Sequence, residues 1–322
     1  MKILQKWKNY IIVYAVLIIL LVICYYSYGD TPSPPRGFSE IHSEDPLDRK
    51  ELLQLMKEIG QTYINVKTKK PFTKHCRDCA VVISSGQLLD KAAGKEIDDA
   101  SCVLRMNDAP IVGHTQDVGR KTTLRVVCFR SLPFLKDSML IGRGKTDMVA
   151  VWGADNPGHN VRSNYLLKRV LDAYRHSPIE VYSMMDKGEK KVVEVFEKEL
   201  GINRVETNTW VSTGVFTMML AIQMCNSVTV YGMVDDDYCR LHPNSYVPYH
   251  YYGRSMLECE MYKQNQQETK DGSHRFLSEK SLFRRWAEMF DIKFQYPKWN
   301  FTKPNVKISK EDVSVQLEAG VA

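Results

Sequence analysis

The stretch CAVVISSG, residues 79–86, decides the fold of this chain. Its apolar run at 79–83 is typical of a buried strand, and the serines and glycine that follow favour a turn. Similar apolar runs recur along the chain, at 124–129, 148–152, 179–182, 228–231 and 292–296. Helical segments lie between them, at 189–200, 214–225 and 278–290. Buried runs rich in β-branched residues that alternate with helices predict an α/β fold with a mostly parallel sheet.

Ligands of such sheets bind in the loops beyond the carboxyl ends of the strands. Three loops are therefore candidates, SSG at 84–86, RMNDAP at 105–110 and GMVDDDYC at 232–239. The amides of the first loop could face a phosphate, and Asn107 in the second offers an amide that both donates and accepts hydrogen bonds. Each of the two could equally be an ordinary polar turn.

A helix start and two histidines complete the candidates for chemistry. Ser212, Thr213 and Gly214 open an apolar helix, where Ser or Thr is first of all an N-cap. The same hydroxyls and amides can also hold a carboxylate or a phosphate. His250 lies in VPYHYYG and His274 in HRFLSE. Histidine suits a general base near neutral pH, although a lone histidine is more often a surface or hydrogen-bonding residue.

An uncharged apolar segment at 10–28, YIIVYAVLIILLVICYYSY, predicts a transmembrane helix because it would reach close to ~30 Å. A cleaved signal peptide would be shorter and end in small residues, whereas this segment ends in tyrosines that suit a membrane interface. Lysines precede the segment, so the positive-inside rule places residues 1–9 in the cytosol and the rest across the membrane. The proline-rich residues 29–45 predict a stem, 46–307 the globular domain and 308–322 a disordered tail.

Seven cysteines follow the apolar segment, at positions 76, 79, 102, 128, 225, 239 and 259. An oxidising compartment beyond the membrane favours disulfides, and an odd number leaves at least one thiol free or paired between chains. Cys76 and Cys79 also have the spacing of a redox pair or half a zinc site, but no second pair at that spacing supports zinc. Asn300 begins the one Asn-x-Ser/Thr sequence of the chain, which predicts a site of N-glycosylation. The net charge of +6 is too small and dispersed to indicate nucleic acid.

In this order the segments resemble the eukaryotic sialyltransferases of the inverting type, whose members share four sequence blocks. The stretch 79–127 looks like the large block, and 212–234, STGVFTMMLAIQMCNSVTVYGMV, looks like the small block. HYYG at 250–253 resembles the third block, and His274 followed by Glu279 resembles the His-x4-Glu of the very small block. The details VGR, VPYHYY and HRFLSEK look most like the short-stem N-acetylgalactosaminide α-2,6-sialyltransferases, which extend sialylated Gal-GalNAc chains on glycoproteins and gangliosides.

The resemblance implies a glycosyltransferase-A-like variant of a Rossmann-type domain and CMP-sialic acid as the donor. It implies His274 as the general base and His250 as the partner of the donor phosphate. The implied donor contacts are Ser84, Ser85, Gly86, Asn107, Ser212, Thr213, Gly214 and Tyr251. Two positions depart from the family pattern, because Ser84 stands where Asn is frequent and Gly253 where an acid usually follows.

The same resemblance also bears on the disulfides and on the cellular location. It implies a disulfide between Cys79 and Cys225, and we expect Cys239 and Cys259 to pair across the tyrosine-rich loop. It also implies a single-pass type II protein of the Golgi membrane with its catalytic domain in the lumen, and it is compatible with a homodimer. The implied reaction is an inverting single displacement by O6 of GalNAc that needs no metal or other cofactor.

Two other classes of function stay open. One is a metal-dependent glycosyltransferase that uses a UDP-sugar, with Asp235, Asp236 and Asp237 on the cation. The other is a membrane-anchored protein that binds sialoglycans without chemistry, although binding alone needs no base. Because CMP leaves with a single phosphate, we expect the acidic triplet to be a solvated loop at the acceptor side, held by Cys239. The sequence does not distinguish glycoprotein from ganglioside acceptors.

Overall fold

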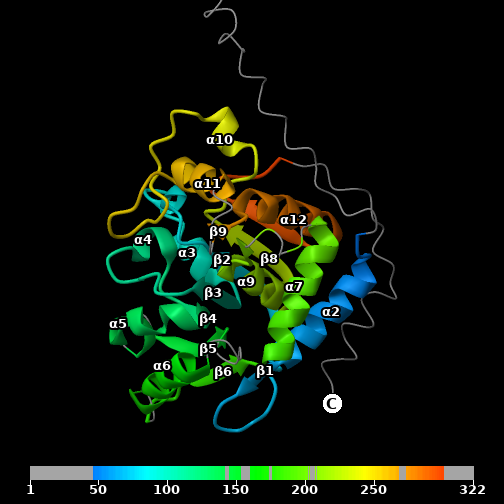
Figure 1. Cartoon of the computed structure of the whole chain (residues 1–322). Helices are drawn as coiled ribbons and strands as arrows, with labels where there is room; N and C mark the ends of the chain where they lie inside the picture. The colour runs from blue at the N-terminus through cyan, green and yellow to red at the C-terminus, as the bar shows by residue number, and fades with distance from the viewer. Residues whose placement is uncertain are drawn as a thin grey trace, which may run out of the picture. The chain divides into compact units, whose positions relative to one another are not determined.

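The chain forms a sheet of eight strands in the spatial order β1-β6-β5-β4-β3-β2-β8-β10 (Figure 1). The computed structural model describes residues 46–300, apart from 142–144, 154–159, 174–175, 202, 204–206, 208 and 268–272. Strand β1 pairs with β6 in antiparallel orientation, and the other neighbours in this sheet are parallel. The strands are β1 (Tyr63–Asn65), β2 (Cys76–Val82), β3 (Cys102–Met106), β4 (Thr122–Cys128), β5 (Thr146–Trp152), β6 (Glu180–Met184), β8 (Cys225–Tyr231) and β10 (Ile292–Gln295).

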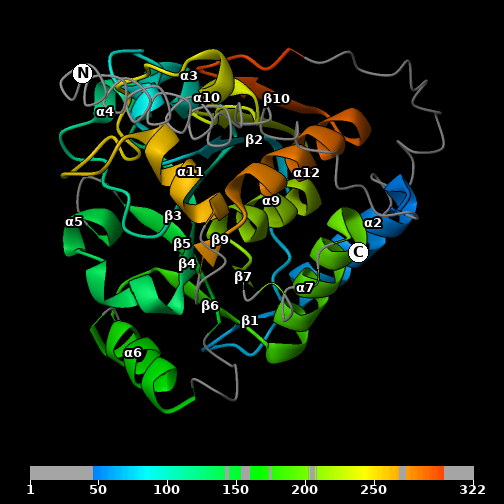
Figure 2. The same cartoon turned by 45° about the horizontal axis from the view of Figure 1, so that its top comes forward.

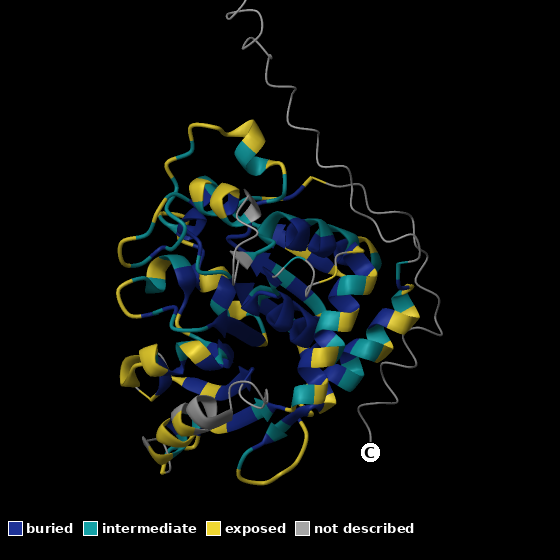
Figure 3. Cartoon of the chain, viewed as in Figure 1, coloured by how far each residue is buried: buried dark blue, intermediate teal, exposed yellow. Residues whose placement is uncertain are grey.

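Alternate residues of the strands pack into different cores on the two faces of the sheet, as the two-residue period of a strand requires. In β2, Val81 belongs to one core, whereas Ala80 and Val82 belong to another. Helices with residues in the first core are α2 (Arg49–Gln61), α7 (Asp186–Leu200), α9 (Thr213–Met224) and α12 (Phe276–Met289). The opposite face is covered by η1 (Gly86–Leu88), α3 (Gly94–Asp99), α4 (Thr115–Val118), η2 (Phe129–Phe134), α5 (Asp137–Leu140) and α6 (Asn160–Ala173). Figure 3 shows the resulting dark-blue buried sheet with exposed residues on the outer helix turns.

A second, two-stranded sheet lies near the carboxyl ends of the main strands. It pairs β7 (Thr209–Trp210) in parallel with β9 (Ser273–His274), and Trp210 lies opposite His274. The remaining helices are α10 (Tyr238–Leu241) and α11 (Glu258–Gln267). In Figure 2, β9 lies beside α11 and α9. This small sheet therefore brings a residue of the last quarter of the chain next to the start of α9.

The predicted mostly parallel α/β fold is confirmed. The six predicted strands correspond to β2, β4, β5, β6, β8 and β10, and the three predicted helices correspond to α7, α9 and α12. The helix predicted at 214–225 ends at Met224 because Cys225 begins β8. Strand β3 was not predicted, because its Arg105 interrupts the apolar pattern. That arginine is nevertheless buried, since its guanidinium donates hydrogen bonds to the carbonyls of Val118 and Lys121.

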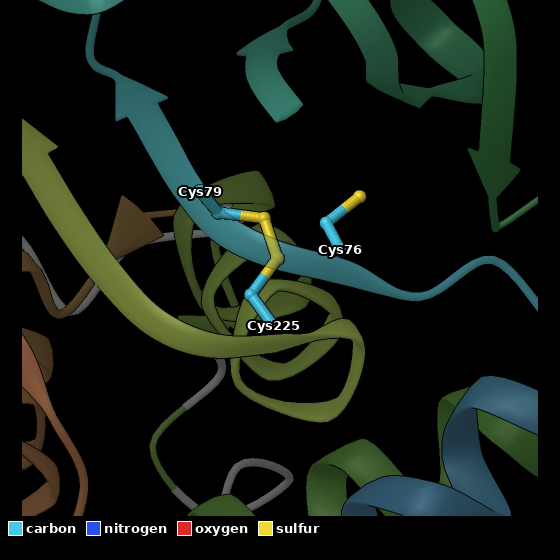
Figure 4. A group of neighbouring side chains, drawn as sticks. All are labelled: Cys76, Cys79 and Cys225. Carbon is cyan, nitrogen blue, oxygen red and sulfur yellow. A yellow bond between two sulfur atoms is a disulfide. The ribbon is translucent and has the colours of Figure 1, made fainter. Parts of the chain in front are cut away.

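Three disulfides join segments around the centre of the sheet and the loop after β8. Their pairs are Cys76–Cys102, Cys79–Cys225 and Cys239–Cys259. Figure 4 shows Cys79 bonded to Cys225, with Cys76 beside them on β2. The free cysteine of the described residues is Cys128, which agrees with the odd number that follows the apolar segment. With Cys76 and Cys79 in disulfides, neither holds a thiolate for zinc.

The predicted membrane segment at 10–28, the stem at 29–45 and the tail at 308–322 lie outside the described residues. Within the described part of the chain, no helix has the length and apolar character needed to cross a membrane. The boundaries of these segments remain predictions.

Candidate active site

The start of α9 is held by a residue of α12. Ser212 is the N-cap, and its hydroxyl accepts a hydrogen bond from the Gly214 amide at 3.1 Å. The same hydroxyl and the Ser212 amide both donate to the Glu279 carboxylate, at 2.5 and 2.8 Å. Glu279 is only 2% exposed, and burial raises the pKa of its carboxyl. The small and the very small blocks therefore meet through one buried carboxylate.

His274 is oriented by a backbone carbonyl in the small sheet. Its Nδ1 lies 2.7 Å from the carbonyl oxygen of Trp210. A carbonyl can only accept a hydrogen bond, so Nδ1 carries the proton and Nε2 has the free electron pair in the neutral ring. That tautomer is the one a general base needs when Nε2 faces the proton to be removed.

Asn107 has a left-handed backbone conformation, with φ of 44°. Two hydrogen bonds hold it there, because Arg125 donates to its carbonyl at 2.7 Å and its own Oδ1 accepts from the Cys128 amide at 3.0 Å. Because Oδ1 accepts this hydrogen bond, the side-chain NH2 is the group of Asn107 that can donate to a ligand. Asparagine tolerates positive φ better than most residues, which explains its place at this turn.

His250 is fixed by the turn that follows β2. Its Nδ1 lies 3.3 Å from the Ser84 carbonyl oxygen, so this nitrogen also carries a proton. The ring stacks on Tyr252 with a centroid distance of 5.0 Å. Burial lowers the pKa of His250, so the free protein holds this ring neutral near pH 7.

The adjacent Ser85 is buried, and its hydroxyl donates to the carboxylate of Glu258 at 2.9 Å. Glu258 also accepts from Gln87 and Tyr262. The first turn after β2 is therefore tied to the start of α11 by a fully hydrogen-bonded buried carboxylate, which fixes the position of the turn.

One cavity of about 220 Å³ at the carboxyl ends of β2, β3 and β8 collects most of the predicted site residues. Those that line it are Ser84, Ser85, Asn107, Ser212, Thr213, Gly214, His250 and His274. We call it the first cavity. Two predicted donor contacts do not line it. Gly86 packs closely against Pro248, and the hydroxyl of the buried Tyr251 donates to the carbonyl of Pro110 at 2.7 Å.

A buried lysine in the first cavity was not predicted. Lys280 is 4% exposed, its ammonium donates to the Val234 carbonyl at 2.6 Å, and it lies 4.4 Å from the ring centroid of Tyr262. Burial lowers its pKa to about 8. Its signal in the sequence was its position directly after Glu279. Further lining residues to which the sequence prediction gave no site role are Ile83, Met106, Met233, Tyr249, Tyr262, Phe276, Glu279 and Phe283.

The acidic triplet differs from the solvated loop that the sequence predicts. Asp236 is paired with Arg284 of α12, and Asp235 lies 3.8 Å from the same guanidinium. Asp237 pairs with Arg240. Only Asp237 has a side chain that is more than half exposed, at 56%. These carboxylates therefore neutralise arginines, and Asp235 and Asp236 fasten the loop to α12. The disulfide Cys239–Cys259 joins the same loop to α11.

Comparison with known proteins agrees with these features. Glycosyltransferase family 29 (sialyltransferase) matches residues 36–289, and the chain belongs to this family. It is a sialyltransferase, and so a glycosyltransferase. A human α-N-acetylneuraminyl-2,3-β-galactosyl-1,3-N-acetylgalactosaminide α-2,6-sialyltransferase is 40% identical over 242 residues, which cover 74% of this chain and 80% of the relative.

Two further proteins show the range of similarity. Human α-N-acetylgalactosaminide α-2,6-sialyltransferase 3 is 37% identical over 74% of this chain and 79% of its own length. A crystal structure of a mammalian sialyltransferase is 18% identical, with a TM-score of 0.45 over 78% of this chain and 80% of that one.

Proposed function

We propose that the chain transfers sialic acid from CMP-sialic acid to O6 of GalNAc in sialylated Gal-GalNAc chains of O-glycoproteins, gangliosides or both. The name of the human relative describes an α-2,6-sialyltransferase for a neuraminyl-galactosyl-N-acetylgalactosaminide, which supports this acceptor and linkage. The observation that carries the proposal is that two features line one cavity. They are His274, which the Trp210 carbonyl orients, and the start of α9, which Ser212 caps.

The proposed reaction is one displacement with inversion at the anomeric carbon of sialic acid. O6 of GalNAc forms the new bond as the bond from that carbon to the phosphate oxygen breaks, and CMP leaves with the electron pair. Nε2 of His274 takes the proton from O6 and later releases it to water. The imidazolium that forms is stabilised by its hydrogen bond to the Trp210 carbonyl.

The donor carries two negative charges near the reacting carbon, one on its phosphate and one on its carboxylate. The amide groups at the start of α9 favour an anion, and the Asn107 NH2 adds a neutral donor. Lys280 places a cation in the wall, and His250 becomes a second one when it takes a proton from solvent as the phosphate binds. These groups would stabilise the charge that grows on the phosphate as CMP departs.

The decisive experiment supplies the full chain with CMP-sialic acid and the trisaccharide sialyl-α-2,3-Gal-β-1,3-GalNAc, in parallel with UDP-sugars and with and without excess EDTA. We expect an α-2,6-linked product from CMP-sialic acid at the same rate in EDTA, because the described groups supply the positive charge themselves. Transfer from a UDP-sugar, or strict dependence on added Mn²⁺, would favour the metal-dependent rival. Binding of sialoglycans with no product would favour the non-catalytic one.

The proposal includes the cellular arrangement implied by the sequence. Residues 10–28 would anchor the chain as a type II protein in the Golgi membrane, with a glycosyltransferase-A-like catalytic domain in the lumen. Its supports are the family and the three disulfides, which suit an oxidising compartment.

A further inference from the structure

A second cavity of about 220 Å³ adjoins the first at the carboxyl ends of β4 and β5. The two cavities share three lining residues, Asn107, Thr213 and His274. The second cavity is otherwise lined by Cys128, Phe129, Arg130, Ser131, Trp152, Gly153, Glu189 and Trp210. His274, the proposed base, therefore lies where the two cavities meet.

The walls of the second cavity combine aromatic rings with a few polar groups, as the ligand pockets of proteins commonly do. Trp152 is held in place by a parallel stack on Phe216, with ring centroids 4.1 Å apart. Its indole N–H is buried and has no hydrogen-bond partner within the described residues. A buried donor without a partner is costly, so a ligand oxygen is the natural acceptor for it.

Charge is distributed unevenly in this cavity. Glu189 is 8% exposed and lies in the first turn of α7, whereas Arg130 is exposed and its guanidinium carbon is 5.8 Å from the Phe129 ring centroid. A buried carboxylate excludes an anion but accepts hydrogen bonds from sugar hydroxyls. An exposed guanidinium on an aromatic face suits a carboxylate that stays at the rim. An anionic oligosaccharide would thus enter with neutral sugars inward and its carboxylate outward.

We propose that this second cavity binds the acceptor glycan and that Arg130 pairs with the carboxylate of the sialic acid that the acceptor already carries. The inference rests on the proposed function, because it assigns the first cavity to CMP-sialic acid. In a single displacement the acceptor hydroxyl must approach the anomeric carbon from the side opposite the leaving phosphate. A base at the junction of two cavities meets this requirement when the donor fills one and the acceptor the other.

The test compares two acceptors, sialyl-α-2,3-Gal-β-1,3-GalNAc and the same disaccharide without sialic acid, in the wild type and Arg130→Gln. We expect Arg130→Gln to raise KM for the sialylated acceptor about tenfold, since a charge-assisted hydrogen bond is lost. KM for the unsialylated acceptor, KM for CMP-sialic acid and the rate of donor hydrolysis should stay unchanged. Lys136→Gln is the matched control, because Lys136 is an exposed cation six residues after Arg130 in the sequence and lines neither cavity.

A second variant tests the cavity without altering charge. Trp152→Phe keeps an aromatic ring against Phe216 but removes the indole N–H, so we expect KM for both acceptors to rise several-fold with donor hydrolysis preserved. The inference is overturned if Arg130→Gln changes KM for both acceptors alike, or if Lys136→Gln has the same effect. It is also overturned if neither variant changes acceptor KM.

Failure of the proposed function has a different signature. In that case the wild type gives no product from CMP-sialic acid and either acceptor. Calorimetric titration of the sialylated trisaccharide into wild type and Arg130→Gln, with CMP present, then decides the inference alone. Weaker binding to the variant supports the second cavity as a glycan site, and equal or absent binding rejects it.

Discussion

At His274 one backbone carbonyl decides which ring nitrogen can accept a proton. The Trp210 oxygen, 2.7 Å from Nδ1, fixes the proton on that nitrogen and leaves Nε2 as the base. A residue on a two-residue strand has little backbone pairing of its own, so this hydrogen bond also sets the angle of the ring. Position and protonation are thus determined together.

We expect His274→Ala to lower kcat for sialic acid transfer by roughly 100- to 10,000-fold, the usual contribution of a general base. The Kd for CMP should change little, because the start of α9, Asn107 and Lys280 are untouched. Steady-state transfer assays and calorimetric CMP titrations measure the two quantities. His242→Ala is the control, since that histidine is exposed and lines neither cavity. Near-normal turnover in the His274 variant would contradict the assignment.

The protonation of the His250 ring determines how we expect donor binding to depend on pH. Its pKa in the free protein is lowered by burial, and its Nδ1–H is engaged by the Ser84 carbonyl. Nε2 can donate to the phosphate only after it takes a proton, and the bound anion then raises the pKa of the ring. Donor affinity is therefore highest below the pKa of the free form. It falls as pH rises toward the pKa of the complex and is constant above it.

We expect KM for CMP-sialic acid to rise between about pH 6 and pH 8, where histidine commonly titrates. The His250→Gln variant should show a higher KM that varies less with pH, because glutamine donates a hydrogen bond without titrating. Donor KM measured across this range for both proteins checks the prediction. An identical pH dependence in the two would assign the proton to another group.

At the scale of elements, the first cavity depends on the joint between α9 and α12. Ser212 caps α9 and delivers two hydrogen bonds to Glu279, so the helix start cannot shift without α12. The neighbouring Lys280 is fixed by the Val234 carbonyl in the loop after β8. One turn of α12 thus positions the anion-binding amides, the buried cation and the loop together.

Ser212→Ala should lower the free energy of unfolding by about 1–2 kcal/mol, as expected for a lost N-cap, and raise KM for CMP-sialic acid. The matched control is Asp48→Ala, which removes the N-cap of α2 on the same face of the sheet. Both variants should unfold at lower urea concentration, but only the Ser212 variant should bind the donor more weakly. If both raise donor KM alike, the joint has no specific role in binding.

Local patterns in the sequence were sufficient for six of the eight strands of the main sheet and for the loops that carry Ser84, Asn107 and Ser212. Each loop follows or precedes an apolar run, so neighbouring residues indicate its position. Local patterns failed to predict the burial or pairing of charged residues whose partners lie far away in the sequence. Arg105 is buried in β3 by carbonyls of a later loop, and Asp236 is neutralised by Arg284 of α12.

At the scale of the whole described domain, the parallel sheet assembles the site from distant parts of the chain. The first cavity receives residues that follow β2, β3 and β8, and the second receives residues that follow β4 and β5. No local pattern could join Cys128, Trp152 and Glu189, because they come from the ends of β4 and β5 and from the first turn of α7, which only the fold brings to one cavity. The second cavity was therefore absent from the sequence prediction, whereas most of the predicted donor-binding and catalytic residues line the first.

The strand order also makes the central disulfide important for stability. Cys79–Cys225 joins β2 to β8 and closes a loop with a sequence separation of 146, whereas Cys239–Cys259 closes one of 20. In the chain-entropy account the longer loop restricts the unfolded state more, so its loss should cost roughly 5 kcal/mol, against roughly 3 for the shorter loop. Cys79 and Cys225 also lie in the core, so the two polar groups left there when this disulfide is removed lower the free energy of unfolding further.

We therefore expect the double variant Cys79→Ser with Cys225→Ser to unfold at a clearly lower urea concentration than Cys239→Ser with Cys259→Ser. The Cys239–Cys259 disulfide should instead affect turnover, because it ties the loop after β8 to α11 at the first cavity. That loop carries Val234 and the acidic triplet. Equilibrium urea unfolding and donor hydrolysis, measured on both double variants and the wild type, separate the two effects. Equal loss of stability in the two variants would mean that loop length does not govern the contribution of these disulfides.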